Sequence, residues 1–167
     1  FKVFGEVFEA YSNMQNISII NNYLPVLGIA HILNYDLNEV LKNITKSNVH
    51  KSRWQEFDFE LDNGQVRLID DTYNASPTSM FEAIRSVDEY VADRIFRKII
   101  IIGDMLELGG FNEKYHSDLV DLINKTNIDH VYFCGEYLSS LFGLVTSKKK
   151  KKHFRSVKDI RSIDEFE

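Results

Sequence analysis

Two polar loops carry the side chains of this sequence that could do chemistry, and the first occupies residues 70–77. It reads Asp-Asp-Thr-Tyr-Asn-Ala-Ser-Pro, so the adjacent carboxylates of Asp70 and Asp71 precede a helix start at Ser76. Adjacent carboxylates repel each other unless a cation, a hydroxyl donor or a helix start compensates. A carboxylate here could bind ribose hydroxyls, and the helix N-terminus would favour an anion. The same pattern also fits an ordinary Asx turn followed by a helix cap.

The second loop, residues 103–110, reads Gly-Asp-Met-Leu-Glu-Leu-Gly-Gly and follows an apolar run. Glycines at both ends let the chain turn out and back. Asp104 and Glu107 could receive the ammonium group of an amino-acid substrate or assist its deprotonation. Their structural alternative is to cap the loop and remain solvated. We expect His116, one turn into the next helix, to pack or cap rather than to catalyse.

The elements that position these loops alternate between strands and helices. The unbroken isoleucines at 99–102 predict a strand covered on both faces of a parallel sheet. Around it the patterns predict a hairpin at 57–69 and, in order, a helix from Ser76, that strand, a helix at 113–125, a strand at 130–135 and a helix at 136–144. This order predicts an α/β fold: a Rossmann-like, open, mostly parallel sheet with flanking helices, doubly wound with right-handed crossovers. Ligands bind such sheets at the carboxyl ends of the strands, where both loops lie.

The first fifty residues have a different character. Loosely alternating apolar positions in residues 1–20 could form a strand or hairpin. Residues 22–34 carry apolar side chains at helical spacing, with Pro25 in the first turn. Asp36 and Glu39 form a capping-box pattern that opens a second, short helix. Two short helices and a strand or hairpin are too few elements to form a separate domain.

Composition narrows the possible functions. The net charge of −5 gives no electrostatic reason to expect nucleic acid or an anionic membrane as a partner. Cys134 is the single cysteine, which excludes an internal disulfide or a cysteine-based metal site and suits a reducing cytoplasm. The sequence contains no phosphate loop, no dinucleotide fingerprint and no clustered metal ligands. The basic run at residues 148–152 predicts a solvated loop.

Together, the two loops resemble signature segments of the Mur ligases. The similar segments are Asp-Asp-Thr-Tyr-Asn-Ala-Ser-Pro-Thr-Ser-Met from residue 70 and Gly-Asp-Met-Leu-Glu-Leu-Gly from residue 103, and the resemblance extends over residues 22–135. It is strongest to the branch that joins D-alanyl-D-alanine to UDP-MurNAc-tripeptide, using ATP and Mg²⁺, in cytoplasmic peptidoglycan synthesis. It implies that residues 1–50 end a central ATPase domain and that residues 51–167 form a truncated, acceptor-binding Rossmann-like domain.

The resemblance also implies roles for individual residues. Five residues would face the nucleotide. Asn22 would face the adenine, Arg53 the ATP phosphates and Asp71 the ribose hydroxyls. Tyr73 and Asn74 would line the same edge of the nucleotide. Asp104 and Glu107 would shape the acceptor side. The resemblance places no metal ligand in this chain, because Mg²⁺ and the triphosphate would be held mainly by the missing central domain. The chain alone is therefore expected to be inactive.

The sequence departs from the family at several places and leaves other functions open. Ser18 and Ile19 stand where relatives carry His-Asn, and a late Lys-Gly-Ser-Arg segment is absent.

A non-catalytic ligand-binding domain with the same scaffold would fit the pattern. A phosphoacceptor receiver domain also uses paired aspartates and a later one, as in Asp70, Asp71 and Asp104, although its strand order differs.

Overall fold

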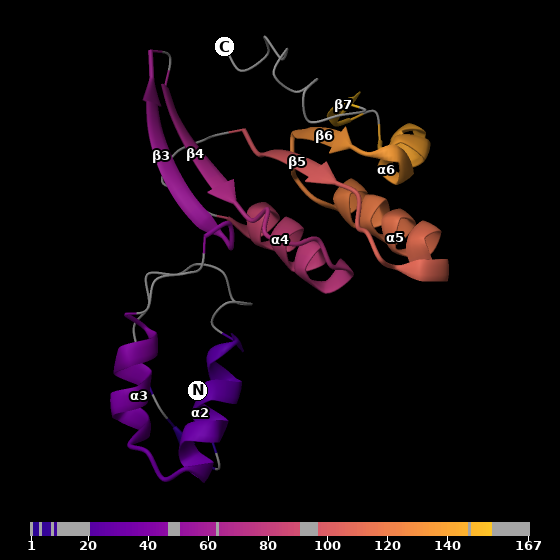
Figure 1. Cartoon of the computed structure of the whole chain (residues 1–167). Coiled ribbons are helices and arrows are strands. Elements are labelled where there is room, and N and C mark those ends of the chain that lie inside the picture. Colours follow the sequence, from indigo (N-terminus) through magenta and orange to yellow (C-terminus); the bar gives the residue numbers. More distant parts are fainter. Residues whose placement is uncertain are drawn as a thin grey trace. The chain divides into compact units, whose positions relative to one another are not determined.

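The computed structural model describes residues 2–3, 5–7, 9, 21–46, 51–62, 64–90, 97–146 and 148–154 (Figure 1). The chain forms two compact units. The first comprises Phe1–Phe57 and Ile69–Asp71, and the second comprises Asp58–Leu68 and Thr72–Glu167. Within the described part, no helix has the length and apolar character needed to cross a membrane.

Before residue 51, the described residues of the first unit form a small antiparallel pair of strands and two helices. The strands are β1 (Lys2–Val3) and β2 (Glu6–Val7), and the helices are α2 (Tyr23–Ile32) and α3 (Leu37–Ile44). The two helices pack through a small core of Leu27, Ala30, Leu37 and Leu41. Asp36 Oδ1 accepts hydrogen bonds from the backbone N–H groups of Asn38, at 2.8 Å, and Glu39, at 3.4 Å. Of the strand or hairpin considered for residues 1–20, the structure has an antiparallel pair, and both helices and the Asp36 cap are confirmed. Ser18 and Ile19 lie outside the described residues.

The hairpin predicted at residues 57–69 is present as β3 (Gln55–Leu61) and β4 (Gly64–Asp70). Figure 1 shows the two strands running in opposite directions. The Arg67 guanidinium donates to both carboxylate oxygens of Asp58, at 2.6 and 2.9 Å. Since this pair lies across the strands, it favours one register. Asn63 in the predicted turn lies outside the described residues.

A three-stranded parallel sheet organises the second unit. Its strands are β5 (Ile99–Gly103), β6 (His130–Cys134) and β7 (Lys150–Phe154), in the order β5-β6-β7. The associated helices are α4 (Pro77–Glu89), α5 (Asn112–Lys125) and α6 (Glu136–Leu141), with short 3₁₀ turns η1 (Gly109–Phe111) and η2 (Phe142–Leu144). The predicted open α/β architecture with a parallel sheet and flanking helices is confirmed.

The core of this unit lies on one face of the sheet. It joins three sheet residues to side chains from all three helices: Ile100, Val131 and Phe133 with Met80, Ile84, Leu119, Val120, Ile123 and Leu138. Ile101, which points to the opposite face, is 48% exposed. The prediction that residues 99–102 are covered on both faces is therefore wrong at this position. The reason is that β5 is an edge strand of the described sheet and the helices of the core pack against the other face.

The basic run at residues 148–152 is not the solvated loop that its composition predicts, because it leads into β7 and contributes most of it. Lys149 is 7% exposed, and its Nζ donates to the backbone carbonyls of Thr126, at 2.6 Å, and Ile128, at 2.9 Å. Lys151 Nζ donates to the carbonyls of Phe142 and Val145, at 3.1 and 2.8 Å. Both ammonium groups therefore satisfy carbonyls just beyond helical segments, where a positive charge is favoured.

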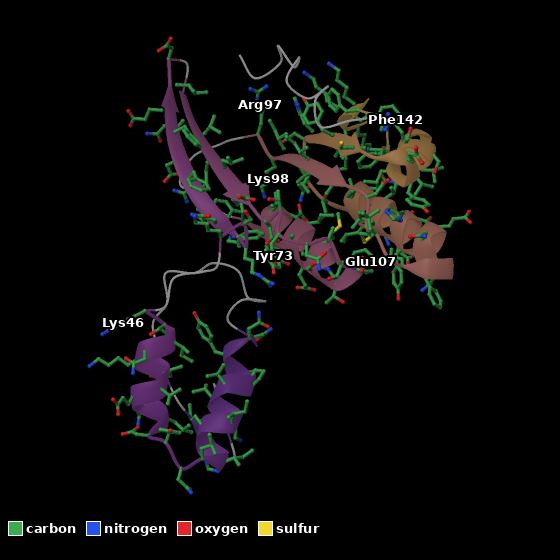
Figure 2. The ribbon with its side chains drawn as sticks, in the orientation of Figure 1. Lys46, Tyr73, Arg97, Lys98, Glu107 and Phe142 are labelled. Carbon is green, nitrogen blue, oxygen red and sulfur yellow. The ribbon has the colours of Figure 1, made fainter. Side chains whose placement is uncertain are left out.

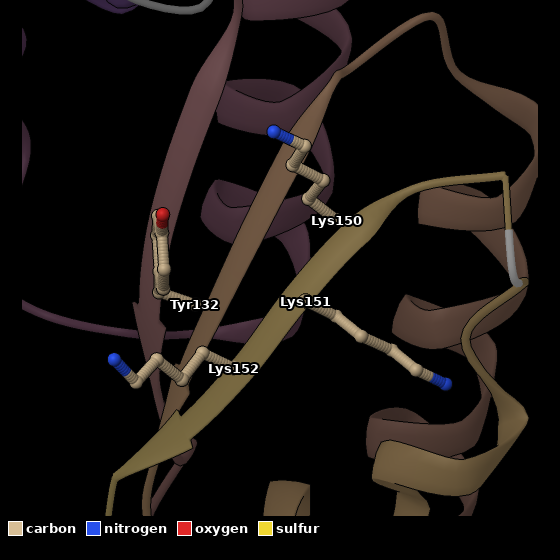
Figure 3. A pocket seen from close by; sticks show the side chains of 4 residues that line it. All are labelled: Tyr132, Lys150, Lys151 and Lys152. Carbon is tan, nitrogen blue, oxygen red and sulfur yellow. The ribbon is translucent and has the colours of Figure 1, made fainter. Parts of the chain in front are cut away.

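The intervening lysines of β7 point the other way. A hollow of ≈ 260 Å³ is lined by Tyr132 and the three lysines 150–152. The side chains of Lys150 and Lys152 lie on the side of Tyr132, whereas the Lys151 side chain extends to the opposite side of the strand (Figure 3). This hollow lies along the middle of the strands. It is therefore separate from the carboxyl end of β5, where the second polar loop begins. The expectation that both loops leave strands of one parallel sheet is wrong for the first loop, because it follows β4, which pairs with β3 in a sheet of its own.

Candidate functional site

The paired carboxylates at the end of β4 are tied to the turn that precedes β3. Ser52 Oγ donates a hydrogen bond to Asp70 Oδ2 at 3.0 Å, and the Trp54 backbone N–H donates to Asp71 Oδ1 at 3.0 Å. A hydroxyl donor and a backbone donor thus compensate the repulsion between the two acids. This compensation was expected from the sequence, but its source, about eighteen residues upstream in the chain, was not.

The turn at residues 52–54 has an unusual backbone. Ser52 and Trp54 have φ angles of 57° and 49°, in the left-handed region that costs a non-glycine residue roughly 1–2 kcal/mol. Trp54 is nonetheless 6% exposed, and its indole Nε1 donates to Glu56 at 3.2 Å. Arg53, between the two strained residues, is exposed. The turn therefore fixes Arg53 near Asp71 and leaves its side chain at the surface.

The electrostatics of Asp71 follow from this arrangement. Partial burial raises the pKa of the Asp71 carboxyl above its usual value, and the nearby Asp70 charge adds to the rise. The Trp54 hydrogen bond and the positive charge of Arg53 oppose it in part. A partly desolvated carboxylate beside an arginine is suited to binding a polar ligand that carries hydroxyl groups and negative charge.

The other three residues predicted to face a nucleotide have modest local roles. Asn22 is exposed at the N-cap of α2, and its side chain makes no capping hydrogen bond. Tyr73, labelled in Figure 2, is 56% exposed. Asn74 Oδ1 accepts from the N–H of Ala75 at 2.8 Å. The helix start that follows is confirmed, since Ser76 caps α4 and forms a reciprocal capping box with Ser79.

In the second loop, Asp104 binds the start of α6. Its Oδ2 accepts from the N–H of Tyr137 at 3.0 Å, and its Oδ1 accepts from the N–H of Leu138 at 2.9 Å. Gly135 makes this approach possible, because a Cβ placed there would lie 2.2 Å from Asp104 Cγ, and its φ of 141° also disfavours other residues. The structure thus gives Asp104 a helix-capping role.

His116 is fully buried and hydrogen-bonded at both ring nitrogens. The Met105 N–H donates to Nε2 at 3.0 Å, and Nδ1 lies 2.7 Å from the carbonyl of Asn112. Because Nε2 accepts, the ring is the neutral tautomer with its proton on Nδ1. The 3.9 Å separation between His116 Nε2 and Asp104 Oδ1 is therefore not an ion pair. The packing role expected for His116 matches this geometry.

Glu107 is the exposed acid of this loop (Figure 2). Its φ of 62° lies in the left-handed region. In the described part of the chain, its carboxylate has no hydrogen bond or ion pair. The neighbouring Leu106 is 69% exposed, whereas Met105 is completely buried. Leu106 and Glu107 therefore form an exposed tip on an otherwise anchored loop.

Sequence reasoning missed the residues that support both loops. Ser52 and Trp54 hold the first, and Gly135 and Tyr137 hold the second. Gly135, directly after a buried strand, was the one available signal of these contacts, since a glycine in such a position often permits another group to approach the backbone closely. No cluster of three or more potential metal-binding side chains occurs among the residues that the structure describes.

The sequence and fold of this chain match known proteins. The family model described as "Mur ligase, glutamate ligase domain" matches residues 53–165, which is more than half of the chain. The chain belongs to the Mur ligase family. A Mur ligase from Rickettsia prowazekii (strain Madrid E), UDP-N-acetylmuramoyl-tripeptide--D-alanyl-D-alanine ligase, is 34% identical over 140 residues, covering 84% of this chain and 30% of the relative.

Two further comparisons agree with this Mur ligase assignment. The enzyme of the same name from Bacillus subtilis (strain 168) is 36% identical over 89 residues, covering 53% of this chain and 18% of its own length. The crystal structure of MurF from Acinetobacter baumannii superposes with a TM-score of 0.65 and 28% identity, covering 81% of this chain and 27% of that one. The chain thus spans less than a third of the length of each of these relatives.

Proposed function

We propose that this chain is the C-terminal part of an ATP-dependent ligase that joins D-alanyl-D-alanine to UDP-MurNAc-tripeptide in cytoplasmic peptidoglycan synthesis. The observation that carries the proposal is the 34% identity, over 84% of the chain, to a ligase named for that reaction. In the reaction, the tripeptide carboxylate is phosphorylated by ATP, with ADP as the leaving group. The amine of D-alanyl-D-alanine then attacks the acyl carbon, phosphate leaves, and the amine loses a proton.

The proposal divides the chain into two parts. Residues 1–50 are the end of the central ATPase domain, and residues 51–167 are the acceptor-binding domain. The family match begins at residue 53, which supports a boundary near the turn that carries Arg53. The triphosphate and Mg²⁺ are held mainly by the remainder of the central domain, so the chain alone is inactive.

On the nucleotide side, Asp71 binds the ribose hydroxyls and Arg53 binds the phosphates. The position of Arg53 beside a partly buried carboxylate supports this pairing, because one group accepts from hydroxyls and the other donates to anions. Asn22 faces the adenine, and Tyr73 and Asn74 line the nucleotide edge. These assignments follow the family pattern and remain to be tested by substitution.

On the acceptor side, Glu107 is the residue that meets the ammonium group of the dipeptide. Its exposure supports this role, since its carboxylate is open to a ligand. Asp104 shapes the same side indirectly, because both of its oxygens already accept backbone hydrogen bonds from α6.

The test uses the full-length protein that carries this chain, with ATP, Mg²⁺, UDP-MurNAc-tripeptide and D-alanyl-D-alanine. Mass spectrometry should detect the tripeptide substrate enlarged by the dipeptide less one water. The Asp71→Ala variant should form the same product with a raised KM for ATP. Absence of the product with the unsubstituted protein, together with measurable binding of the dipeptide, would favour the non-catalytic ligand-binding alternative.

A further inference from the structure

The loop between β5 and α5 is anchored on both sides of its exposed tip. Before the tip, Asp104 binds two backbone N–H groups of α6, and Met105 is buried with its N–H bound to His116. After the tip, Leu108 packs against the core, and its carbonyl accepts from the N–H of Phe111 at 3.1 Å. Movement of the tip is therefore restricted at each end.

The tip itself is held in a conformation that its sequence does not favour. Glu107 is a non-glycine residue with a φ of 62°. Such a backbone persists where the surrounding contacts impose it, and it is enriched at functional sites. Here those contacts are the anchors on Met105 and Leu108.

His116 is suited to holding this loop and unsuited to proton transfer. It is fully buried, and each of its ring nitrogens is committed to one backbone group. Its ring stacks on Tyr137, with centroids 5.2 Å apart and planes inclined by 24°. Since the Tyr137 N–H also binds Asp104, His116 and Asp104 connect the loop to α5 and α6 at adjacent points.

We propose that His116 is a positioning residue for the acceptor dipeptide. Together with Asp104 and Gly135, it holds the tip of the loop so that the Glu107 carboxylate meets the ammonium group of the dipeptide. This inference rests on the proposed ligase function. A carboxylate fixed in place binds an ammonium group better than a mobile one, because less conformational entropy is lost on binding. The exposed Leu106 provides an apolar neighbour for an alanine methyl group.

Two substitutions at residue 116 separate positioning from general stability. His116→Asn keeps a donor near Nδ1, so it can bind the Asn112 carbonyl, but it is too short to reach the Met105 N–H. His116→Gln keeps an acceptor near Nε2, so it can bind Met105 and loses the Asn112 contact instead. Each variant therefore loses one buried hydrogen bond, and only the asparagine variant releases the loop.

The expected result is a selective change in KM in the full-length protein. His116→Asn should raise the KM for D-alanyl-D-alanine about tenfold, which corresponds to about 1.4 kcal/mol, a typical penalty for one unsatisfied buried donor. Its KM for ATP should stay within about twofold, and His116→Gln should keep both KM values near those of the unsubstituted protein. A fall in kcat with all KM values unchanged in both variants would overturn the positioning role.

Hydrogen exchange provides a second readout in the same protein. In the asparagine variant, exchange should rise in residues 103–110 and remain unchanged in the middle of α5. If that variant does not fold, the glutamine variant decides the matter, since a dipeptide KM raised about tenfold in it would contradict the proposal and an unaltered one would support it. Failure of the unsubstituted protein to form product would count against the ligase function itself, so the two failures are distinguishable.

Discussion

At the residue scale, groups that can transfer protons are used to position the backbone. Both carboxylate oxygens of Asp104 accept hydrogen bonds from N–H groups of α6, and both ring nitrogens of His116 form hydrogen bonds with backbone groups. These hydrogen bonds hold the loop that carries the exposed carboxylate of Glu107. An acid found in a loop of this kind should therefore be judged by its hydrogen-bond partners, and exposure favours Glu107 over Asp104 for the contact with substrate that we propose.

Gly135 gives a direct stability test of the contact with Asp104. Gly135→Ala should reduce the free energy of unfolding by about 2 kcal/mol or more, because the added Cβ overlaps the carboxylate and the backbone conformation is strained. Urea denaturation of the full-length protein measures this change.

Gly143→Ala is the matched control, since a Cβ there meets no atom within 4 Å among the described residues. It should change the unfolding free energy by less than about 0.5 kcal/mol. Equal effects of the two substitutions would contradict the close packing of Asp104 against Gly135.

Asp71 should show a conflict between stability and ligand binding. Because burial raises its folded-state pKa above the unfolded value, the carboxyl favours the folded state while it is protonated. That contribution is present below the unfolded pKa, near 3.8, and is lost as the pH rises through the folded pKa. Asp71→Asn keeps an acceptor for the Trp54 N–H and carries no charge.

The asparagine variant should therefore be at least as stable as the unsubstituted protein at pH 7, with the difference shrinking as the pH falls toward 4. Thermal unfolding of both proteins across this range measures the effect. The KM of the asparagine variant for ATP should nonetheless rise, because the charged group that we propose binds the ribose hydroxyls is gone. The quantity compared is the stability of the variant minus that of the unsubstituted protein. If this difference were smaller at pH 7 than at pH 4, burial would not raise the pKa of Asp71.

At the element scale, the basic run at residues 148–152 shows that alternate lysines can donate to backbone carbonyls of their own domain. Alternate residues of a strand point to opposite faces, so Lys149 and Lys151 reach carbonyls beyond helical segments while Lys150 and Lys152 face away. Composition alone favours a solvated loop for this run. The difference arises because the partners of Lys149 lie more than twenty residues earlier in the chain.

Lys149→Met should destabilise the protein by about 2 kcal/mol, since it leaves the carbonyls of Thr126 and Ile128 without their charged donor. Lys150→Met removes the same charge from the exposed face and should change stability by less than about 0.5 kcal/mol. Chemical denaturation distinguishes the two. A Lys149 variant as stable as the Lys150 variant would show that the buried ammonium group is dispensable.

The other elements were largely predictable, because their signals are local. The Asp36 cap, the Ser76-Pro77 helix start and the apolar runs of β5 and β6 each depend on residues close in sequence. The contacts that support the candidate site are not local. Asp104 binds residues more than thirty positions later, and Asp71 binds Trp54 seventeen positions earlier. Spacing rules that cover one or two helical turns cannot predict such pairs.

At the scale of the whole molecule, this member of the Mur ligase family matches only part of the length of its relatives. It spans 30% of the length of its relative from Rickettsia prowazekii. Forming the peptide bond requires the amine and the activated carboxylate to be held together. Under the proposed function, the loop between β5 and α5 and the turn that holds Asp71 contribute to this step only together with domains that hold the triphosphate and the UDP substrate.

We propose above that the full-length protein couples ATP cleavage to the joining of a dipeptide and a UDP-linked tripeptide. Phosphate release, measured with each substrate omitted in turn, tests it most directly. Sustained release is expected only when ATP, UDP-MurNAc-tripeptide and D-alanyl-D-alanine are all present. Release at an unchanged rate without D-alanyl-D-alanine would contradict it.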